Sequence, residues 1–479
     1  MKSSAAPIIV LFRKDLRISD NRALAAAADT GRPVVPLFIL DEGGAGARPT
    51  GAASRWWLHH SIAALSKSIE KLGATLLLRK ADTQKIVAET IKASGADTVF
   101  WNRRYAPPDI VVDTALKTAL RADGLDAESF DGFLLNEPSR VATQSGDFYK
   151  VFTPFYKRLA SDTEARDPID APKSLPECSA RLKSEKLDAF GLLPTKPDWS
   201  GGLAECWQPG EDGARDRLET FLEDRLDGYA DSRDKPGEDG TSGLSPHLAH
   251  GEITPFQIMA ALTRRSGRDA ETFRKELAWR EFSYHLLFHR PKLGQENFRP
   301  EFDSFEWQSA PAALKAWQRG QTGYPIVDAG MRELWQTGWM HNRVRMIAAS
   351  FLIKDLLIDW RKGEEWFWDT LVDADAANNP ASWQWVAGSG ADAAPYFRIF
   401  NPVLQGEKFD PDGSYVRRYV PELANLPDRY VHRPWEAPAP VLKDSGLELG
   451  KGYPRPIVDH AQARDRAMAA YRATRGGEN

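Results

Sequence analysis

The feature that most constrains this chain is residues 338–405, where tryptophan, asparagine, arginine and aspartate recur within helical sequence. The stretch contains GWMHNRVRMIAASFLIKDLLIDW, VDADAANNPASWQW and YFRIFNPVLQ. On a helix, Asn342, Arg345 and Met346 are spaced i, i+3 and i+4, so an amide, a guanidinium and a thioether project from one face. The apolar residues of the same segment can hold this helix in a core: Ile347, Phe351, Leu352 and Leu356.

A half-buried Arg345 requires a carboxylate, because an unpaired charge in an apolar environment is costly. Asp373 and Asp375 are the nearest acidic candidates in the sequence. Spacing alone leaves two interpretations open. The segment is either a core helix with a satisfied ion pair or one wall of a ligand site.

Composition bounds the class of protein. A chain of 479 residues predicts two or three domains. A net charge of −4 argues against a protein that coats nucleic acid through bulk positive charge, although it allows a local basic face. Two cysteines, Cys178 and Cys206, with no CxxC pattern predict a reducing cytoplasm and no structural metal. We also expect no signal peptide and no membrane span.

Strand and helix patterns alternate from residue 1 to about residue 130. IIVLF, VVPLFIL, ATLLL and DTVFW are typical of strands, and one helical stripe between them ends at Gly73, which we expect to form the C-terminal cap: Leu58, Ile62, Leu65, Ile69 and Leu72. This alternation predicts an α/β domain with a doubly wound parallel sheet. FRKDLRISDN stands where GxGxxG would follow the first strand, so ordinary dinucleotide binding is not predicted there.

Residues 131–210 lose this periodicity and accumulate proline and charge, which predicts a long surface connector. Within it, DFYKVFTPFYKR carries Lys150, Lys157 and Arg158, which either contact nucleic-acid phosphates or are solvated. From residue 211 to 479 nearly every segment is helical. We therefore expect a large all-α C-terminal domain.

Two motifs in this part could bind ligands. In GTSGLSPHLAHGEITP, Ser245 is expected as the helix N-cap before Pro246, and Thr241, Ser242 and Gly243 complete a possible anion cradle, although capping alone explains Ser-Pro. In FRKELAWREFSYHLL, Glu276, Trp279 and Arg280 share a helix face, which could equally be a surface ion pair.

The ordered motifs MHNRVRM, DWRKGEEWF, VDADAANN, WQW and FRIFNP resemble the flavin-binding domain of the photolyase and cryptochrome family, in particular the cyclobutane pyrimidine dimer photolyases. The resemblance is strongest over residues 216–418. It implies non-covalently bound FAD in the helical domain. It also implies that a definite set of residues contacts the flavin: Tyr229, Thr241, Ser242, Gly243, Leu244, Ser245, Phe273, Arg280, Arg345, Asp373, Asp375 and Asn379.

Within that set the resemblance implies distinct roles. Arg345, held by Asp373, supplies positive charge to the anionic reduced flavin, and Asp375 accepts a hydrogen bond from its edge. Asn379 matches the amide that faces the ring, and its distance in sequence from Asp373 favours it over Asn378. Many members carry arginine where Gly243 stands, so one phosphate contact is expected to be missing.

A second set is implied for the substrate and for electron transfer. Glu276 would hydrogen-bond the damaged bases, Trp279 would stack on them, and the remaining lining would comprise Asn342, Arg345, Met346, Trp385 and Gln405. Glu276, Asn342 and Asn379 would take the catalytic roles. Trp383, Trp360 and Trp307 match a relay that carries an electron from the surface to photoexcited oxidised flavin, although all three could be core filler.

The implied function is light-driven repair of cyclobutane pyrimidine dimers in DNA by a carbon–carbon lyase, expected to be monomeric, cytoplasmic and associated with the nucleoid when bound to DNA. The alternatives are a blue-light receptor, repair of (6-4) photoproducts, whose pattern places histidines at Asn342 and Met346, and a nucleotide-binding protein without a yellow chromophore. Glu276, Met346, Trp385 and Asn379 favour dimer repair.

A light-harvesting antenna chromophore is also expected. WNRRYAPPDI lacks the acidic contact of folate-binding members, so methenyltetrahydrofolate bound differently, a deazaflavin or no antenna all stay open, with methenyltetrahydrofolate favoured.

Overall fold

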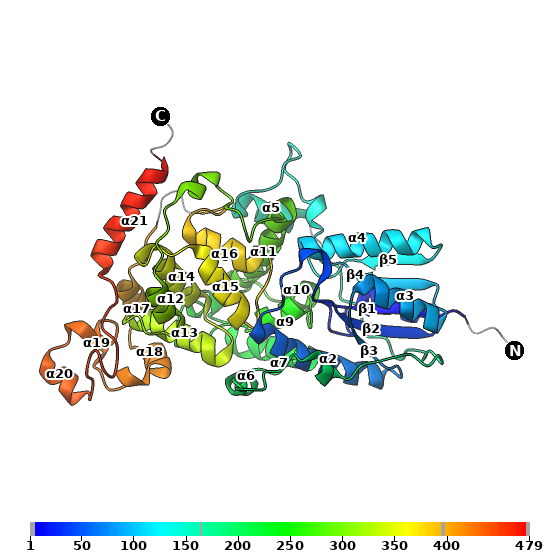
Figure 1. Cartoon of the computed structure of the whole chain (residues 1–479), viewed down its shortest axis with the longest axis horizontal. Coiled ribbons are helices and arrows are strands. Elements are labelled where there is room, and N and C mark those ends of the chain that lie inside the picture. The colour runs from blue at the N-terminus through cyan, green and yellow to red at the C-terminus, as the bar shows by residue number, and fades with distance from the viewer. Residues whose placement is uncertain (1–4, 163–164, 394–397, 476–479) are drawn as a thin grey trace. The chain divides into compact units, whose positions relative to one another are not determined.

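The computed structural model describes residues 5–162, 165–393 and 398–475, which belong to two compact units (Figure 1). The first unit comprises residues 1–149, 153–223 and 242–291. The second unit comprises residues 150–152, 224–241 and 292–479. None of the helices in the described part of the chain combines the length and hydropathy that crossing a membrane requires.

A five-stranded, entirely parallel sheet forms the centre of the first unit, with the order β3-β2-β1-β4-β5. Its strands are β1 (Ile8–Phe12), β2 (Val34–Leu40), β3 (Leu77–Lys80), β4 (Thr98–Asn102) and β5 (Asp126–Phe130). The predicted doubly wound sheet is confirmed. Strand β5 was not predicted, because DAESF lies at the sheet edge and buries only Ala127 fully, so it lacks an apolar run.

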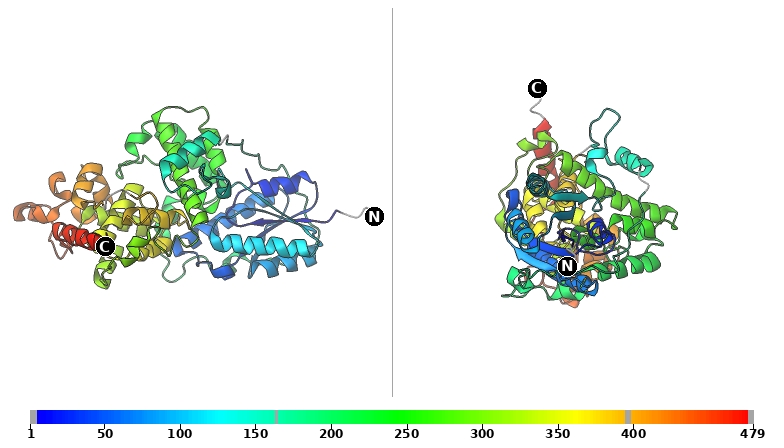
Figure 2. Two further views of the ribbon diagram at one scale, coloured as in Figure 1. Left: turned by 90° about the horizontal axis from the view of Figure 1, so that it is seen from above. Right: turned by 90° about the vertical axis from the view of Figure 1, so that its right-hand side faces the viewer.

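Helices cover both faces of this sheet, as Figures 1 and 2 show. Successive β1 side chains point to opposite faces. Ile8, Val10 and Phe12 pack with helices α1 (Arg22–Asp29) and α2 (Ala52–Lys71), whereas Ile9 and Leu11 pack with α3 (Thr83–Ser94) and α4 (Pro107–Ala122).

The predicted stop of α2 is confirmed. Gly73 has a φ of +89°, its N–H donates to the Glu70 carbonyl, and the N–H of Ala74 donates to the Ile69 carbonyl. This pair of hydrogen bonds requires a left-handed residue, which glycine adopts without steric cost.

The remaining α-helices of the first unit are α5 (Phe152–Asp162), α6 (Gly201–Cys206), α7 (Glu211–Thr220), α9 (Ser245–His250), α10 (Pro255–Ala261) and α11 (Arg268–His289). Helices α5 and α6 fall within the stretch expected to be a connector. That stretch also returns to the sheet, because the N–H of Leu175 donates to the Leu72 carbonyl and Glu177 forms a bridge with Val34. Such isolated long-range contacts leave no periodic pattern in a sequence.

Helix α11 is anchored to residues 133–137 by two neighbouring charged side chains. Arg280 donates from Nη1 to the Phe133 carbonyl at 3.0 Å, and its guanidinium lies 4.4 Å from the centre of the Phe133 ring. Glu281 accepts a hydrogen bond from the N–H of Asn136 at 3.3 Å. Burial raises the pKa of Glu281 to about 7.

We expect Glu281→Gln to remove a pH dependence of stability. Between the ordinary pKa of 4.5 and about 7, the unfolded chain is ionised at Glu281 while the folded protein keeps its proton. The folded state therefore binds more protons, and stability falls as pH rises through this window. Relative to wild type, the free energy of unfolding of the variant should rise by about 3 kcal/mol from the acidic to the basic side of the window, as measured by denaturant unfolding on either side of it. Parallel pH profiles for the two proteins would contradict this.

Helices joined by turns and loops make up the described part of the second unit, which contains no β-strand there, and this confirms the predicted mostly helical part. Its helices are α8 (Tyr229–Ser232), α12 (Pro311–Gln318), α13 (Pro325–Thr337), α14 (Asn342–Ser350), α15 (Trp360–Thr370), α16 (Asn378–Ala387), α17 (Pro402–Phe409), α18 (Ser414–Tyr419), α19 (Asp428–Val431), α20 (Ala439–Asp444) and α21 (His460–Arg475). A continuous core around Trp317, Phe351, Trp360 and Tyr415 joins most of them.

Candidate functional site

The ion pair predicted for Arg345 is present in the second unit. Nη2 of Arg345 donates to Oδ2 of Asp373 at 2.8 Å, and Nε donates to the Met340 carbonyl at 2.7 Å. The Asp373 side chain is 4% exposed and the Arg345 side chain 24% exposed. The carboxylate is thus buried beneath a guanidinium that remains accessible, which places an oriented positive charge at the surface of the core.

Asp375 organises the start of helix α16. Its Oδ1 accepts from the backbone N–H groups of Ala377 at 2.8 Å and Asn378 at 2.7 Å, and from the Asn378 side chain at 2.9 Å. These bonds fix the first turn of the helix that carries Asn379. A flavin contact of Asp375 stays a prediction.

The amide of Asn379 is held by Glu364, a residue that the sequence analysis missed. Nδ2 of Asn379 donates to the Glu364 carbonyl at 3.1 Å and to Glu364 Oε1 at 2.8 Å, and both side chains are buried. With its donor committed in this way, the amide presents its oxygen on the other side. Glu364 falls on the apolar stripe of α15 with Trp360, Gly363 and Phe367, and this misplaced charge is the signal that could have revealed it.

The three relay tryptophans differ in burial. Trp383 is 2% exposed and Trp360 is 0% exposed, whereas Trp307 is only partly buried and packs beside Phe305 with ring centres 4.4 Å apart. Trp383 packs directly on α15, because a Cβ at Gly363 would lie 2.1 Å from its Cη2. Trp360 precedes Gly363 by one turn and donates from Nε1 to Asn297 Oδ1 at 3.0 Å. Two of the three indoles are thus buried and one is partly exposed, and the relay stays a prediction.

Asn342, Met346 and Gln405 lie on helices α14 and α17 of the second unit. Asn342 is exposed and Met346 half-buried on α14, and Gln405 is half-buried on α17. Arg343 of α14 contacts α17, because its guanidinium lies 4.5 Å from the centre of the Phe409 ring. On its own helix, its Nη1 lies 3.8 Å from Met346 Sδ. The structure therefore brings Asn342, Met346 and Gln405 onto neighbouring elements.

Three further predicted residues of this unit lie on other elements. Trp385 is half-buried on α16, and Tyr229 is buried at the start of α8. The carbonyl of Thr241 accepts from Arg225 Nη1 at 3.4 Å.

In the first unit the prediction that Ser245 is a helix N-cap was wrong, whereas its flavin contact stays a prediction. Helix α9 begins at Ser245, and Leu244, with φ −83° and ψ −7°, is the N-cap without a side-chain capping bond. The hydroxyl of Ser242 accepts from the Leu244 N–H at 3.3 Å. This local turn already gives Leu244 a helical conformation, so the helix starts one residue earlier than the Ser-Pro pattern indicates.

Gly243 has a neighbour that the sequence did not reveal. Its φ is +63°, and a Cβ at this position would lie 2.5 Å from Nη1 of Arg217. Arg217 is held by a hydrogen bond to the Cys206 carbonyl at 2.9 Å and by the ring of Trp207, whose centre is 4.3 Å from its guanidinium. The left-handed backbone favours glycine here, and without a Cβ the Arg217 guanidinium can lie directly against this turn.

The remaining predicted residues of the first unit lie on α11. Glu276 and Trp279 are half-buried. Phe273 is 3% exposed and packs on Phe221 with ring centres 4.4 Å apart, and Arg280 is turned toward Phe133. Phe273 and Arg280 therefore contribute to the interior in this structure, and their flavin contacts stay predictions.

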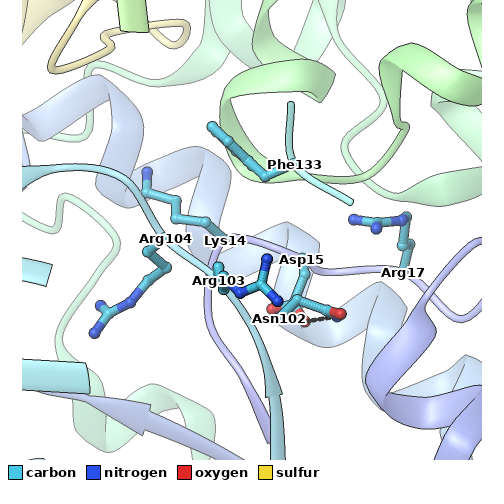
Figure 3. A pocket seen from close by; sticks show the side chains of 7 residues that line it. All are labelled: Lys14, Asp15, Arg17, Asn102, Arg103, Arg104 and Phe133. Atoms are coloured by element: carbon cyan, nitrogen blue, oxygen red, sulfur yellow. Dashed lines mark hydrogen bonds between the residues drawn. The ribbon is translucent and has the colours of Figure 1, made fainter. Parts of the chain in front are cut away.

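A second basic site lies in the first unit at the carboxyl ends of β1 and β4, where the strand order reverses (Figure 3). Ligands of doubly wound sheets bind at such switch points. The hollow has a volume of about 210 Å³ and is lined by Lys14, Asp15, Arg17, Asn102, Arg103, Arg104 and Phe133. Nδ2 of Asn102 donates to Asp15 Oδ2 at 2.7 Å.

The chain is similar to known proteins over almost its whole length. Residues 8–175 match the family described as DNA photolyase, and residues 273–473 match the FAD binding domain of DNA photolyase. The deoxyribodipyrimidine photo-lyase of Agrobacterium fabrum is 58% identical over 479 residues, covering 99% of both chains. Cryptochrome-2 of Arabidopsis thaliana is 39% identical, covering 98% of this chain and 79% of the plant protein.

The fold agrees with these matches. The crystal structure of a class III photolyase from Agrobacterium tumefaciens superposes with a TM-score of 0.97 at 57% identity, covering 99% of each chain. The chain belongs to the DNA photolyase and cryptochrome family.

Proposed function

We propose that this protein is a deoxyribodipyrimidine photo-lyase, which repairs cyclobutane pyrimidine dimers in DNA with the energy of light. The observation that carries the proposal is the ion pair of the accessible Arg345 with the buried Asp373, in a region whose sequence matches the photolyase FAD-binding domain and which also holds the Glu364-bound amide of Asn379. The high identity to a photo-lyase over the full chain favours repair over the more distant cryptochromes.

The residues present fit FAD. Arg217, which lies against Gly243, offers a guanidinium to a diphosphate, and Arg345 offers one to the anionic ring. Bound FAD supplies a light-excited one-electron donor that regains its electron once the two bonds joining the pyrimidines have broken, so there is no net oxidation. The protein's own task is to extrude the dimer, orient it and exclude water.

We assign these tasks to the predicted lesion residues. Trp279 and Trp385 offer aromatic faces on which bases stack without a sequence code. Glu276 can accept a hydrogen bond from the base edges, and Asn342, Met346 and Gln405 complete the wall. A dimer disturbs base stacking, so it costs less to extrude than intact bases.

Irradiation of a defined substrate tests the function. The reduced protein is mixed with an oligonucleotide that carries one cyclobutane dimer, illuminated with blue light and then removed, and restored thymines are quantified by chromatography. We expect restoration only in the light. A fully reduced, illuminated protein that restores no thymine would overturn the proposal and favour a photoreceptor.

We also propose an antenna chromophore in the first unit, at the basic hollow of Figure 3. Lys14, Arg17, Arg103 and Arg104 favour an anionic ligand such as the glutamate tail of methenyltetrahydrofolate. Ion pairs with Glu137, Asp109 and Asp113 neutralise part of this charge. The lining side chains leave no room for even a water-sized molecule, so they must move aside for a chromophore to bind. Heat release followed by chromatography distinguishes a folate from a deazaflavin.

The remaining proposals concern the domain boundaries, the oligomeric state and the location of the protein in the cell. We infer an antenna domain over residues 1–130, a connector over 131–210 and a flavin- and lesion-binding domain over 211–479. We further propose a monomer that works in the cytoplasm and joins the nucleoid when it binds damaged DNA. Size-exclusion chromatography with and without DNA tests the oligomeric state.

A further inference from the structure

A buried carboxyl group lies at the start of α14, among residues that the sequence analysis did not single out. Glu333, on α13, is 6% exposed. Its Oε2 accepts from the hydroxyl of Tyr415 at 2.6 Å and from the N–H of His341 at 3.1 Å, and its Oε1 accepts from the hydroxyl of Tyr419 at 3.4 Å. Because His341 is the N-cap of α14, Glu333 joins α13 and α18 to the beginning of that helix.

The same cap leads directly to Arg345. The N–H of Arg345 donates to the His341 carbonyl at 2.9 Å, whereas the N–H of His341 donates to Glu333. The positive charge of Arg345 also acts on Glu333, where it lowers the pKa against the larger, opposite effect of burial. Two carboxyl groups are therefore coupled to one guanidinium, Asp373 by direct contact and Glu333 through the start of α14.

The charge of Glu333 changes near neutral pH. Burial raises its pKa to about 7, and the hydrogen bonds from Tyr415 and His341 and the charge of Arg345 oppose this rise only in part. His341 does not compensate the ionised carboxylate, because burial lowers the pKa of His341 to about 4 and leaves its imidazole uncharged. Burial also raises the pKa of Tyr415 well above its ordinary value, so its hydroxyl stays protonated.

The other charged groups on α13 and on the helices packed against it are paired, hydrogen-bonded or exposed. The ion pairs are Arg332 with Glu422, Arg343 with Asp234, Arg417 with Asp428 and Glu407 with Arg433. Asp328 accepts from the Tyr453 hydroxyl at 2.6 Å, and Asp410 accepts from the N–H of Tyr415 at 2.9 Å. Water screens the exposed cations of these helices, which are Lys315, Lys408 and Arg418. The charge on Glu333 therefore acts mainly on Arg345.

We propose that Glu333 is a positioning residue whose protonation state sets how strongly the protein prefers reduced over oxidised FAD. When Glu333 is neutral, Arg345 and Asp373 form a pair without net charge. When Glu333 is ionised, two carboxylates share one guanidinium, so their surroundings become negative and disfavour an anionic ring. The oxidised ring is neutral and gains little from either state. This inference rests on the proposed function and deepens it, because it names a determinant of the flavin state that the site holds.

Equilibrium dialysis of the full-length holoprotein in the dark tests this role. It gives the dissociation constants of oxidised FAD and of chemically reduced FAD, at about pH 6 and about pH 9, on either side of the pKa of Glu333. An anionic ring favours the neutral carboxyl, so Glu333 supports binding of reduced FAD below this pKa and ceases to do so as the pH rises through it.

Glu333→Gln keeps a hydrogen-bond acceptor without a charge and is the decisive variant. From the lower to the higher pH, wild type should lose affinity for reduced FAD by on the order of tenfold more than this variant, as expected of one added unit charge at roughly 10 Å. Affinity for oxidised FAD should change equally in the two proteins. Any titration of free flavin is common to both, so their comparison isolates Glu333.

Two further variants complete the design. Glu281→Gln removes a carboxyl whose pKa burial also raises to about 7, but in the first unit, and should keep the pH dependence of wild type. Tyr415→Phe removes the hydroxyl that donates to Glu333 at 2.6 Å and stabilises its charged form. The fall in affinity for reduced FAD should therefore move to higher pH in Tyr415→Phe, a shift that loss of packing alone would not produce.

The outcomes separate this role from the function itself. The same pH dependence for reduced FAD in wild type and Glu333→Gln would overturn the role, and so would equal effects on both flavin states. Loss of both flavin states in Glu333→Gln, with an unshifted pH dependence in Tyr415→Phe, would mean that Glu333 acts through packing and would also overturn it. In each of these cases a wild type that retains FAD and restores thymines leaves the proposed function standing. A wild type that binds no FAD would overturn both.

Discussion

Asp373→Ala should purify almost free of flavin. The substitution removes the carboxylate that lies beneath Arg345. The Asp373 side chain is 4% exposed in the folded protein. Breaking a fully buried ion pair by deleting one partner costs ~3–5 kcal/mol. The cost is smaller here, because the Arg345 side chain is 24% exposed and keeps its bond to the Met340 carbonyl, so the main effect is loss of the contact that orients the guanidinium. Arg345 would turn away from the ring position to reach water or another acceptor. The measurement is the ratio of FAD to protein after purification, from absorption of the native and heat-released cofactor.

A control must show that losing any arginine partner does not have the same effect. Glu422 provides it, because it binds Arg332 at 2.8 Å within the same unit and is not among the predicted flavin contacts. We expect Glu422→Ala to keep a full complement of FAD. Asp373→Asn, which retains a hydrogen-bond acceptor without charge, should bind an intermediate amount. Full flavin occupancy in Asp373→Ala would show that the pair does not support the cofactor.

The sequence could predict the parts of the fold that repeat. The parallel sheet and the stop of α2 were readable because buried strands are continuous apolar runs and Gly73 must adopt a left-handed conformation. The face of α14 was also readable, since residues spaced i, i+3 and i+4 must share a side of a helix. The cost of an unpaired charge predicted a carboxylate partner for Arg345 and left two candidates, Asp373 and Asp375, of which the structure shows Asp373.

What could not be predicted depends on contacts between distant segments. Arg217 reaches Gly243 from a helix that lies 26 positions earlier in the chain. Glu364 holds Asn379 only because α15 and α16 pack together, with Trp383 against Gly363. The edge strand β5 has one buried face and therefore no strong pattern. In each case a tertiary contact, rather than a local preference, decides the structure.

Replacing Trp383 with phenylalanine should slow the blue-light reduction of bound oxidised FAD by more than an order of magnitude. A phenyl ring fills most of the same space but is much harder to oxidise than an indole, so packing is largely kept while the electron path is cut. Trp383 is the candidate for the inner position, because it is 2% exposed and packs on the helix that begins with Trp360. Flavin absorption during illumination with an external reductant gives the rate.

The comparison among tryptophans decides whether these positions form the relay. Trp360→Phe and Trp307→Phe should also slow photoreduction, whereas Trp101→Phe, which removes an equally buried indole from the sheet of the first unit, should not. Chemically reduced Trp383→Phe should still repair dimers, because repair draws its electron from flavin that is already reduced. Wild-type photoreduction in all three relay variants would exclude these positions, and would leave the partly buried Trp307 as ordinary packing beside Phe305.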